Sequence, residues 1–229
     1  MSEKENIITI DGPAGVGKST VSRRVAAATG FAYLDTGAMY RAVGLYLKRH
    51  AIDLDNPKEI AYILKTLRLE LVPAVNEHSD VGVFINGEDV SDPIRTPEMA
   101  MIASRVSAVP VVRDILTEIQ RGYGKKGKIV AEGRDTGTVV FPDAAYKFFL
   151  DAKPEERARR RVEQLQKKGI AASLQQILEL TLERDKNDRS RSVAPLKQAD
   201  DALLIDTTTI TLEAVVLRIL GEIAKKDGR

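Results

Sequence analysis

One short segment, at residues 12–19, constrains the fold of this chain more than any other. It reads GPAGVGKS and fits the pattern G-x-x-x-x-G-K-[ST]. The apolar run NIITID at 6–11 predicts a short buried strand before it, and Val21 and Val25 predict a helix after it. A glycine-rich turn in this setting points its backbone N–H groups inward, at the positive end of the helix. The sequence therefore predicts an α/β protein with a phosphate-binding loop for ATP or GTP.

The residue types in this loop each have a chemical task. The glycines allow the backbone to turn, and Lys18 is expected to reach the β and γ phosphates of the nucleotide. The hydroxyl of Ser19 is placed to ligate Mg²⁺, and Thr20 adds a second hydroxyl. The predicted ATP-binding residues are Gly12, Pro13, Ala14, Gly15, Val16, Gly17, Lys18, Ser19 and Thr20.

Strands and helices alternate along most of the remaining chain. Further strands are predicted at 31–35, 128–135, 146–151 and 202–206. Helices are predicted at about 37–49, from 57, at 97–108, 110–122 and 173–186, and from 211. Asn56 is the expected N-cap of the helix at 57, and Ser173 with Gln176 forms a capping box. Because parallel strands require crossover connections, this order predicts a P-loop-type parallel sheet with helices on both faces.

Residues 68–95 have a different character. Within them LRLELV and VGVFING alternate with period two, and Asn86-Gly87 is a pair typical of hairpin turns. We predict a small β-rich insert at 68–95. The segments 1–67 and 96–229 then form the core.

The composition argues against several classes of site and location. Cysteine is absent, and His50 and His78 lie far apart, so a thiolate zinc site or a cage of protein ligands is not expected. A formal net charge of +2 gives no reason to expect nucleic-acid binding. No stretch reaches the roughly 18 consecutive apolar residues of a membrane helix, and the N-terminus lacks a signal-peptide pattern. We expect a cytoplasmic protein whose metal is Mg²⁺, bound together with ATP.

The rest of the chain separates a kinase from other P-loop proteins. A guanine-reading Asn-Lys-x-Asp motif is absent, since DKND at 185–188 has the wrong order. A motor or transporter ATPase should have adjacent Asp and Glu at the end of an apolar strand, and the strand FFLDA at 148–152 has only the Asp. Arginines instead occur at several separate loop and helix positions, as an enzyme that handles two phosphorylated substrates requires.

Four longer motifs carry a family resemblance. They are DTGAMYR at 35–41, IRT at 94–96, EGRDTGTVVFPDA at 132–144 and RSVAPL at 191–196. With them the chain closely resembles the bacterial cytidylate kinases, from about residue 6 to about 220. The resemblance implies a core, an acceptor-binding insert and a mobile lid, which we place at about 153–170. It also implies transfer of the γ-phosphoryl of ATP to CMP or dCMP, giving ADP and CDP or dCDP, with Mg²⁺.

The resemblance assigns roles to individual positions. The implied CMP-binding residues are Thr36, Tyr40, Arg41, Ser104, Arg113, Arg134, Asp135, Arg184, Asp188 and Arg191. The implied catalytic residues are Lys18, Arg134, Arg157 and Arg161, with Arg160 a further lid arginine. Glu132 departs from the pattern, because the family often has aspartate there.

Chemistry supports some of these positions independently of the resemblance. Arg41 and Arg134 each follow a predicted strand end, so both can reach the edge of the sheet where such folds bind ligands. Arg184, Asp188 and Arg191 share one face if their helix continues that far. The alternatives are surface ion pairs for the arginines and a core position for the ring of Tyr40.

The crowded arginines at 157–161 are costly unless an anion approaches them. They favour a lid over an RNA-binding helix, because no aromatic stacking platform accompanies them. Two other functions remain open: a P-loop kinase for another acceptor, such as UMP or shikimate, and a nucleotide-dependent switch without phosphotransfer. Since every required group lies in one chain, a monomer is sufficient.

Overall fold

A computed structural model of the chain describes residues 7–73, 79–167, 169–226 and 228. Its main sheet has the strand order β2-β6-β1-β7-β8, and every pairing in it is parallel. The strands are β1 (Ile7–Asp11), β2 (Ala32–Asp35), β6 (Ile129–Gly133), β7 (Tyr146–Asp151) and β8 (Leu203–Asp206). The predicted parallel sheet is confirmed, and its strands all end at one edge.

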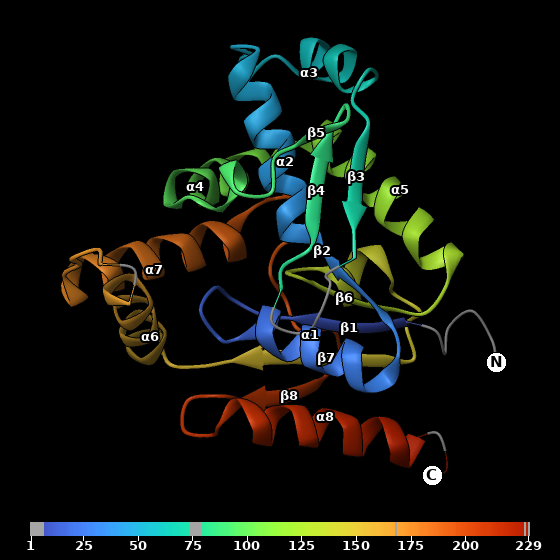
Figure 1. The fold of residues 1–229 in the computed structure, drawn as a ribbon, viewed down its shortest axis with the longest axis vertical. Helices are drawn as coiled ribbons and strands as arrows, with labels where there is room; N and C mark the ends of the chain where they lie inside the picture. Colours follow the sequence, from blue (N-terminus) through green and yellow to red (C-terminus); the bar gives the residue numbers. More distant parts are fainter. Residues whose placement is uncertain (1–6, 74–78, 168, 227, 229) are drawn as a thin grey trace.

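Side chains of β1 point alternately to the two faces of the sheet, and each face packs against a different set of helices. Ile8 and Ile10 are fully buried in an apolar cluster with α1 and α8. Ile7 packs against the cluster on the other face, which contains residues of α2 and α5. Figure 1 shows α8 on the opposite side of the molecule from α2 and α5. These helices are α1 (Lys18–Thr29), α2 (Thr36–Arg49), α5 (Pro110–Lys126) and α8 (Leu212–Lys226).

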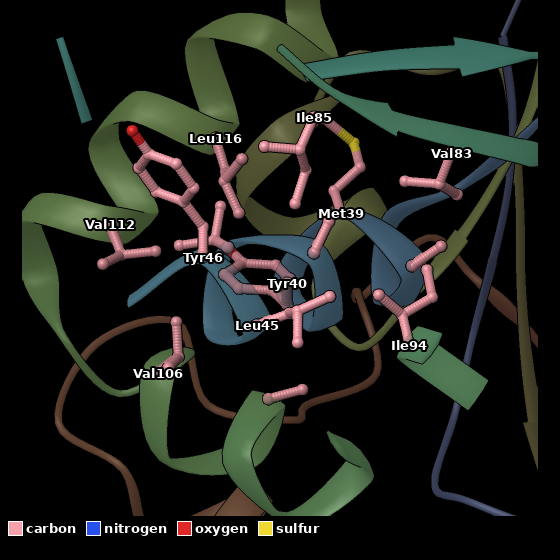
Figure 2. Close-up of a cluster of buried hydrophobic side chains, with 14 of the residues drawn as sticks. Met39, Tyr40, Leu45, Tyr46, Val83, Ile85, Ile94, Val106, Val112 and Leu116 are labelled. Atoms are coloured by element: carbon pink, nitrogen blue, oxygen red, sulfur yellow. The ribbon is translucent and has the colours of Figure 1, made fainter. Parts of the chain in front are cut away.

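The predicted insert contains a separate antiparallel sheet of β3 (Leu69–Val72), β4 (Gly82–Ile85) and β5 (Glu88–Asp89). Asn86 and Gly87 join β4 to β5 with φ of 51° and 86°, so the predicted hairpin turn is confirmed. Figure 2 shows Val83 and Ile85 of β4 close to Met39 of α2. The insert therefore shares its apolar core with the main domain.

Helix boundaries confirm one predicted cap and correct another. Helix α3 (Pro57–Leu64) is capped by Asn56, whose Oδ1 accepts from the Glu59 amide at 3.2 Å. Helix α7 (Leu174–Ser190) follows Ser173, but the Ser173 side chain makes no capping hydrogen bond. The predicted capping box is wrong because Ser173 is exposed, and water can satisfy the free amides there. The helix also continues past 186.

The remaining elements lie around the carboxyl edge of the sheet. Helix α4 (Pro97–Val106) contacts α2, and η3 (Thr136–Val140) is a short π-helical turn after β6. Helix α6 (Pro154–Gln166) pairs with α7 at one side of the molecule, where the lid was predicted (Figure 1). A short 3-10 turn, η2 (Pro93–Arg95), precedes α4. In the part of the chain that the structure describes, no helix is both long and apolar enough to cross a membrane.

Candidate active site

The phosphate loop has the backbone conformation that its glycines predict. Gly12 and Gly17 have φ of 146° and 94°, values that residues other than glycine rarely adopt. A Cβ on Gly12 would lie 2.0 Å from the carbonyl oxygen of Leu150, so no larger residue fits beside β7. The loop ends at Lys18, the first residue of α1, as the motif requires.

Lys18 is buried and directed back over the loop. Its Nζ donates to the carbonyl oxygen of Pro13 at 2.6 Å. Burial, and then the nearby charge of Arg134, lowers the pKa of Lys18 well below its ordinary value. A polyphosphate at this position would offset the cost of the buried cation, which is the arrangement a donor-nucleotide site requires.

A cavity of about 780 Å³ opens from this loop across the carboxyl edge of the sheet. Residues 14–20 of the loop line it, together with side chains from α2, α4, α6 and α7 and the segment 207–212. Every residue predicted to bind CMP also lines it, namely Thr36, Tyr40, Arg41, Ser104, Arg113, Arg134, Asp135, Arg184, Asp188 and Arg191. One cavity thus joins the phosphate loop to the predicted acceptor residues.

Three of the arginines that line this cavity, Arg41, Arg134 and Arg184, form a cationic cluster. Arg41 Nη2 lies 3.1 Å from Asp35 Oδ2, and Arg134 Nε lies 2.9 Å from Asp188 Oδ2. The Nε atoms of Arg41 and Arg184 are buried without a hydrogen-bond partner. Burial, with Arg134 close by, lowers the pKa of Arg184 to about 10. Such a cluster is suited to a doubly charged phosphate.

A second group of side chains surrounds Asp135. Arg113 forms a buried ion pair with Asp135 Oδ2, and Arg191 Nη2 lies 3.4 Å from Oδ1. Tyr40 has its ring 5.5 Å from the Arg113 guanidinium carbon, and its hydroxyl is buried without a partner. Figure 2 shows Tyr40 among the apolar residues of α2, so it belongs to the core as well as to the cavity wall. Donors and acceptors here could read the polar edge of a base.

Ser107 belongs to this group, and sequence reasoning missed it. Its hydroxyl donates to the Ser104 carbonyl oxygen at 2.8 Å and accepts from Arg191 Nη1 at 3.1 Å. Its own carbonyl oxygen accepts from Arg113 Nη1 at 3.1 Å. The available signal was weak: Ser107 follows Ser104 by three residues and so lies on the same side of α4.

Glu132 connects β6 to the phosphate loop. Its Oε1 accepts from Ser19 Oγ and from Tyr33 Oη, each at 2.7 Å, whereas its Oε2 is buried without a partner. Burial, and then Asp35, raises the pKa of Glu132. Thr36 Oγ1 donates to the Glu132 carbonyl oxygen at 2.6 Å.

These oxygens fit Mg²⁺. The Ser19 hydroxyl and the unpartnered Glu132 oxygen are hard ligands, as this ion prefers. The described residues contain no cluster of three or more His, Cys, Asp or Glu side chains, so protein groups alone do not surround an ion. Magnesium commonly takes one or two carboxylates together with substrate phosphates, which agrees with this arrangement.

The lid helix presents a different face to the cavity from the one predicted. Arg157 and Arg161 do not line the cavity, whereas Arg160 does. The guanidinium of Arg157 is buried behind the phosphate loop, and Arg161 Nη1 lies 3.4 Å from Gln164 Oε1. Arg157 is buried and Arg161 is exposed, so neither reaches the cavity in this arrangement. Their catalytic role stays a prediction.

Comparisons with known proteins agree with this geometry. The family model described as cytidylate kinase matches residues 8–225. The cytidylate kinase of Mannheimia succiniciproducens is 47% identical over 97% of this chain and 98% of its own length. That of Thermodesulfovibrio yellowstonii is 47% identical over 96% of this chain and 99% of its own.

A solved structure is similar in fold alone. The crystal structure of an uncharacterized protein from Eubacterium ventriosum has a TM-score of 0.50 and 13% identity, and covers 99% of this chain and 100% of its own. The family assignment therefore rests on the sequence matches, which extend over nearly the whole chain. The residues that line the cavity lie within the matched range. The chain belongs to the cytidylate kinase family.

Proposed function

We propose that this protein transfers the γ-phosphoryl of ATP to CMP or dCMP, giving ADP and CDP or dCDP. Family membership supports this reaction. The single structural observation that carries it is the cavity that joins the phosphate loop to the arginines and Asp135. A donor nucleotide and an acceptor phosphate can meet there without leaving the protein.

The donor side is formed by the loop amides, Lys18 and Ser19. The amides and Lys18 hold the ATP phosphates, as in other P-loop enzymes. Ser19 and Glu132 would hold Mg²⁺, which supplies charge neutralisation at the β and γ phosphates when bound. Because the transferred group carries most of the charge, positioning and electrostatics account for most of the catalysis.

The acceptor side is formed by the arginine cluster and the group around Asp135. Arg41, Arg134 and Arg184 fix the acceptor phosphate for in-line attack, so no covalent enzyme intermediate is required. Asp135 accepts a hydrogen bond from the cytosine amino group, with Arg113 and Arg191 beside it. Ser104 and Tyr40 complete the wall, and Thr36 and Asp188 hold neighbouring groups in place.

The lid at 153–170 would close over both substrates and exclude water, which otherwise competes as the acceptor. Of the three predicted lid arginines, Arg160 lines the cavity, so it is the one that could reach a bound phosphate without a change in the lid. Arg157 and Arg161 would need such a change. The described residues of the insert at 68–95 do not line the cavity, so its part in acceptor binding stays a prediction. A monomer is sufficient for this reaction, because one chain provides the residues that line the cavity. We expect the protein to act in the cytoplasm.

The test is ADP formation with ATP, Mg²⁺ and a panel of CMP, dCMP, UMP and shikimate. We expect turnover with CMP and dCMP. Turnover with shikimate alone would support a different small-molecule kinase, and nucleotide binding without turnover would support a switch.

A Lys18→Ala variant tests the donor site. Loss of a charge aimed at the transferring phosphate should lower kcat by about 10²–10³-fold. Lys65→Ala, an exposed lysine at the end of α3 outside the cavity, is the matched control and should retain full activity. Near-normal transfer by Lys18→Ala would contradict the assignment.

A further inference from the structure

Asp11 lies at the junction between the central strand and the phosphate loop. It is the last residue of β1, paired with Gly133 of β6 on one side and Phe149 of β7 on the other. The next residue, Gly12, has its backbone against the Leu150 carbonyl oxygen. The backbone at Asp11 is therefore held by neighbouring strands on both sides.

The Asp11 carboxylate binds the segment that carries the acceptor groups. Its Oδ1 accepts from the Thr136 amide at 2.9 Å and from Thr136 Oγ1 at 2.8 Å. Its Oδ2 accepts from the Gly137 amide at 2.7 Å. Thr136 directly follows Arg134 and Asp135. These three hydrogen bonds therefore fix the backbone next to the two residues, and with it the positions of their Cα atoms.

Close packing prevents the segment from sliding on the carboxylate. A Cβ on Gly137 would lie 2.9 Å from Thr9 Oγ1 and 3.3 Å from Asp11 Oδ2. The fit leaves no space for a side chain at Gly137. It also means that a change in the carboxylate would displace the segment instead of being absorbed by a gap.

A carboxylate is a costly choice for a purely structural contact here. Asp11 is buried, and within the described residues no lysine or arginine forms an ion pair with it. Burial raises the pKa of Asp11 to about 6. Two oxygens that accept from three donors give a more exact placement than one amide or hydroxyl oxygen would.

We infer that Asp11 is a positioning residue, which holds the acceptor-binding residues Arg134 and Asp135 in register with the phosphate loop. The inference rests on the proposed function for the identity of the acceptor. In-line transfer depends on the relative placement of donor and acceptor to within about an ångström, so this contact sets the geometry of the reaction without touching a substrate.

The arrangement predicts which substrate site is displaced when the hydrogen bonds between Asp11 and residues 136–137 are broken. β1 is paired on both sides, whereas Thr136 and Gly137 lie outside the sheet. The acceptor segment would therefore move, and the phosphate loop would keep its position. Arg134 would then lose its alignment with Asp188, and Asp135 its alignment with Arg113.

Two variants break the contact from opposite sides. In Asp11→Asn, an amide NH₂ replaces one oxygen and faces an N–H donor, and in Thr136→Val a methyl replaces the hydroxyl. Calorimetry should show CMP binding weakened about 10-fold in each, with ATP binding within about 2-fold of wild type. The double variant should lose less than the product of the two, because both remove the same contact.

Thr136→Ser, which keeps the hydroxyl, should restore CMP binding. Asp201→Asn is the control for loss of a hydrogen-bonded carboxylate, because Asp201 contacts Lys147 and does not line the cavity. Should Asp11→Asn fail to fold, Thr136→Val and its serine counterpart decide the question.

Equal weakening of CMP and ATP, or no weakening of either, would overturn the inference. The proposed function is tested separately by turnover of CMP in the wild-type protein. If wild type bound CMP without turnover, the reaction would be wrong while the selective loss in Asp11→Asn could still establish the positioning role.

Discussion

The pKa values of two buried carboxylates near the cavity, Asp11 and Asp188, shift in opposite directions because their neighbours differ. At Asp11, whose partners are backbone amides and a hydroxyl, burial raises the pKa to about 6. At Asp188 burial acts in the same direction, but Arg134 and Arg184 together outweigh it and lower the pKa. Asp188 is therefore charged throughout the neutral range, whereas Asp11 changes its protonation in mildly acidic solution.

The raised pKa of Asp11 predicts a pH-dependent stability. The folded state binds this proton more tightly than the unfolded chain, in which the pKa is near 3.8. The contribution of Asp11 thus favours folding below about pH 4 and is lost as the pH rises through about 6, by about 3 kcal/mol in all. Urea unfolding of wild type and Asp11→Asn at pH 4 to 7 should show their difference in unfolding free energy changing by about this amount. A difference independent of pH would contradict the prediction.

Helix α6 supports the phosphate loop through one arginine. Arg157 donates from Nε to the Ala152 carbonyl oxygen at 2.9 Å and from Nη1 to the Ala14 carbonyl oxygen at 3.1 Å. The same Nη1 lies 2.9 Å from Asp185 Oδ1 on α7. A single side chain of α6 thus contacts both the loop and α7, which explains why this arginine is buried.

An Arg157→Lys variant should disturb the donor site. Lysine keeps the charge but cannot reach all three partners, since it lacks the planar fork of the guanidinium. We expect the KM for ATP to rise about 10-fold, the KM for CMP to change less than about 2-fold, and the free energy of unfolding to fall by about 2 kcal/mol.

Steady-state kinetics and urea unfolding measure these changes. Arg189→Lys on α7 is the matched control, because Arg189 is exposed and lies 3.7 Å from Asp151. An equal rise in both KM values would argue against a specific link to the phosphate loop.

The whole molecule surrounds the cavity with parts that are far apart in sequence. Asp80 in the insert pairs with Arg23 of α1 and lies 2.9 Å from Arg95, so the insert is tied to the core. Helices α6 and α7 line part of the cavity. A ligand that contacts several of these parts binds only the folded protein, so it should stabilise the whole structure.

Acceptor selectivity should therefore appear in unfolding experiments. CMP at about 100 times its Kd should raise the free energy of unfolding by about 2.7 kcal/mol. UMP at the same concentration should stabilise less, because its carbonyl oxygen in place of an amino group would face the acceptor Asp135. Thermal unfolding with each nucleotide, in wild type and in Asp135→Asn, measures the effect. If CMP and UMP stabilised the wild-type protein equally, Asp135 would not be the residue that distinguishes cytosine from uracil.

The sequence by itself determined the elements and the location of the cavity. Hydrophobic period and glycine spacing are local signals, and they predicted the phosphate loop, the parallel sheet and the hairpin at Asn86-Gly87. Since parallel strands all end at one edge, residues that follow strand ends, such as Arg41 and Arg134, had to meet there.

Only the tertiary structure decided which side chains contact one another. Asp11 and Thr136 are 125 positions apart, and no local pattern indicates their contact. The direction of Arg157 depends on which face of α6 packs against α7 and the phosphate loop, and a helix rich in arginine all round does not reveal that face. Ser107 likewise acquires its role only when Arg113 and Arg191 reach it. Local propensity specifies elements, whereas hydrogen-bond partners depend on how those elements pack.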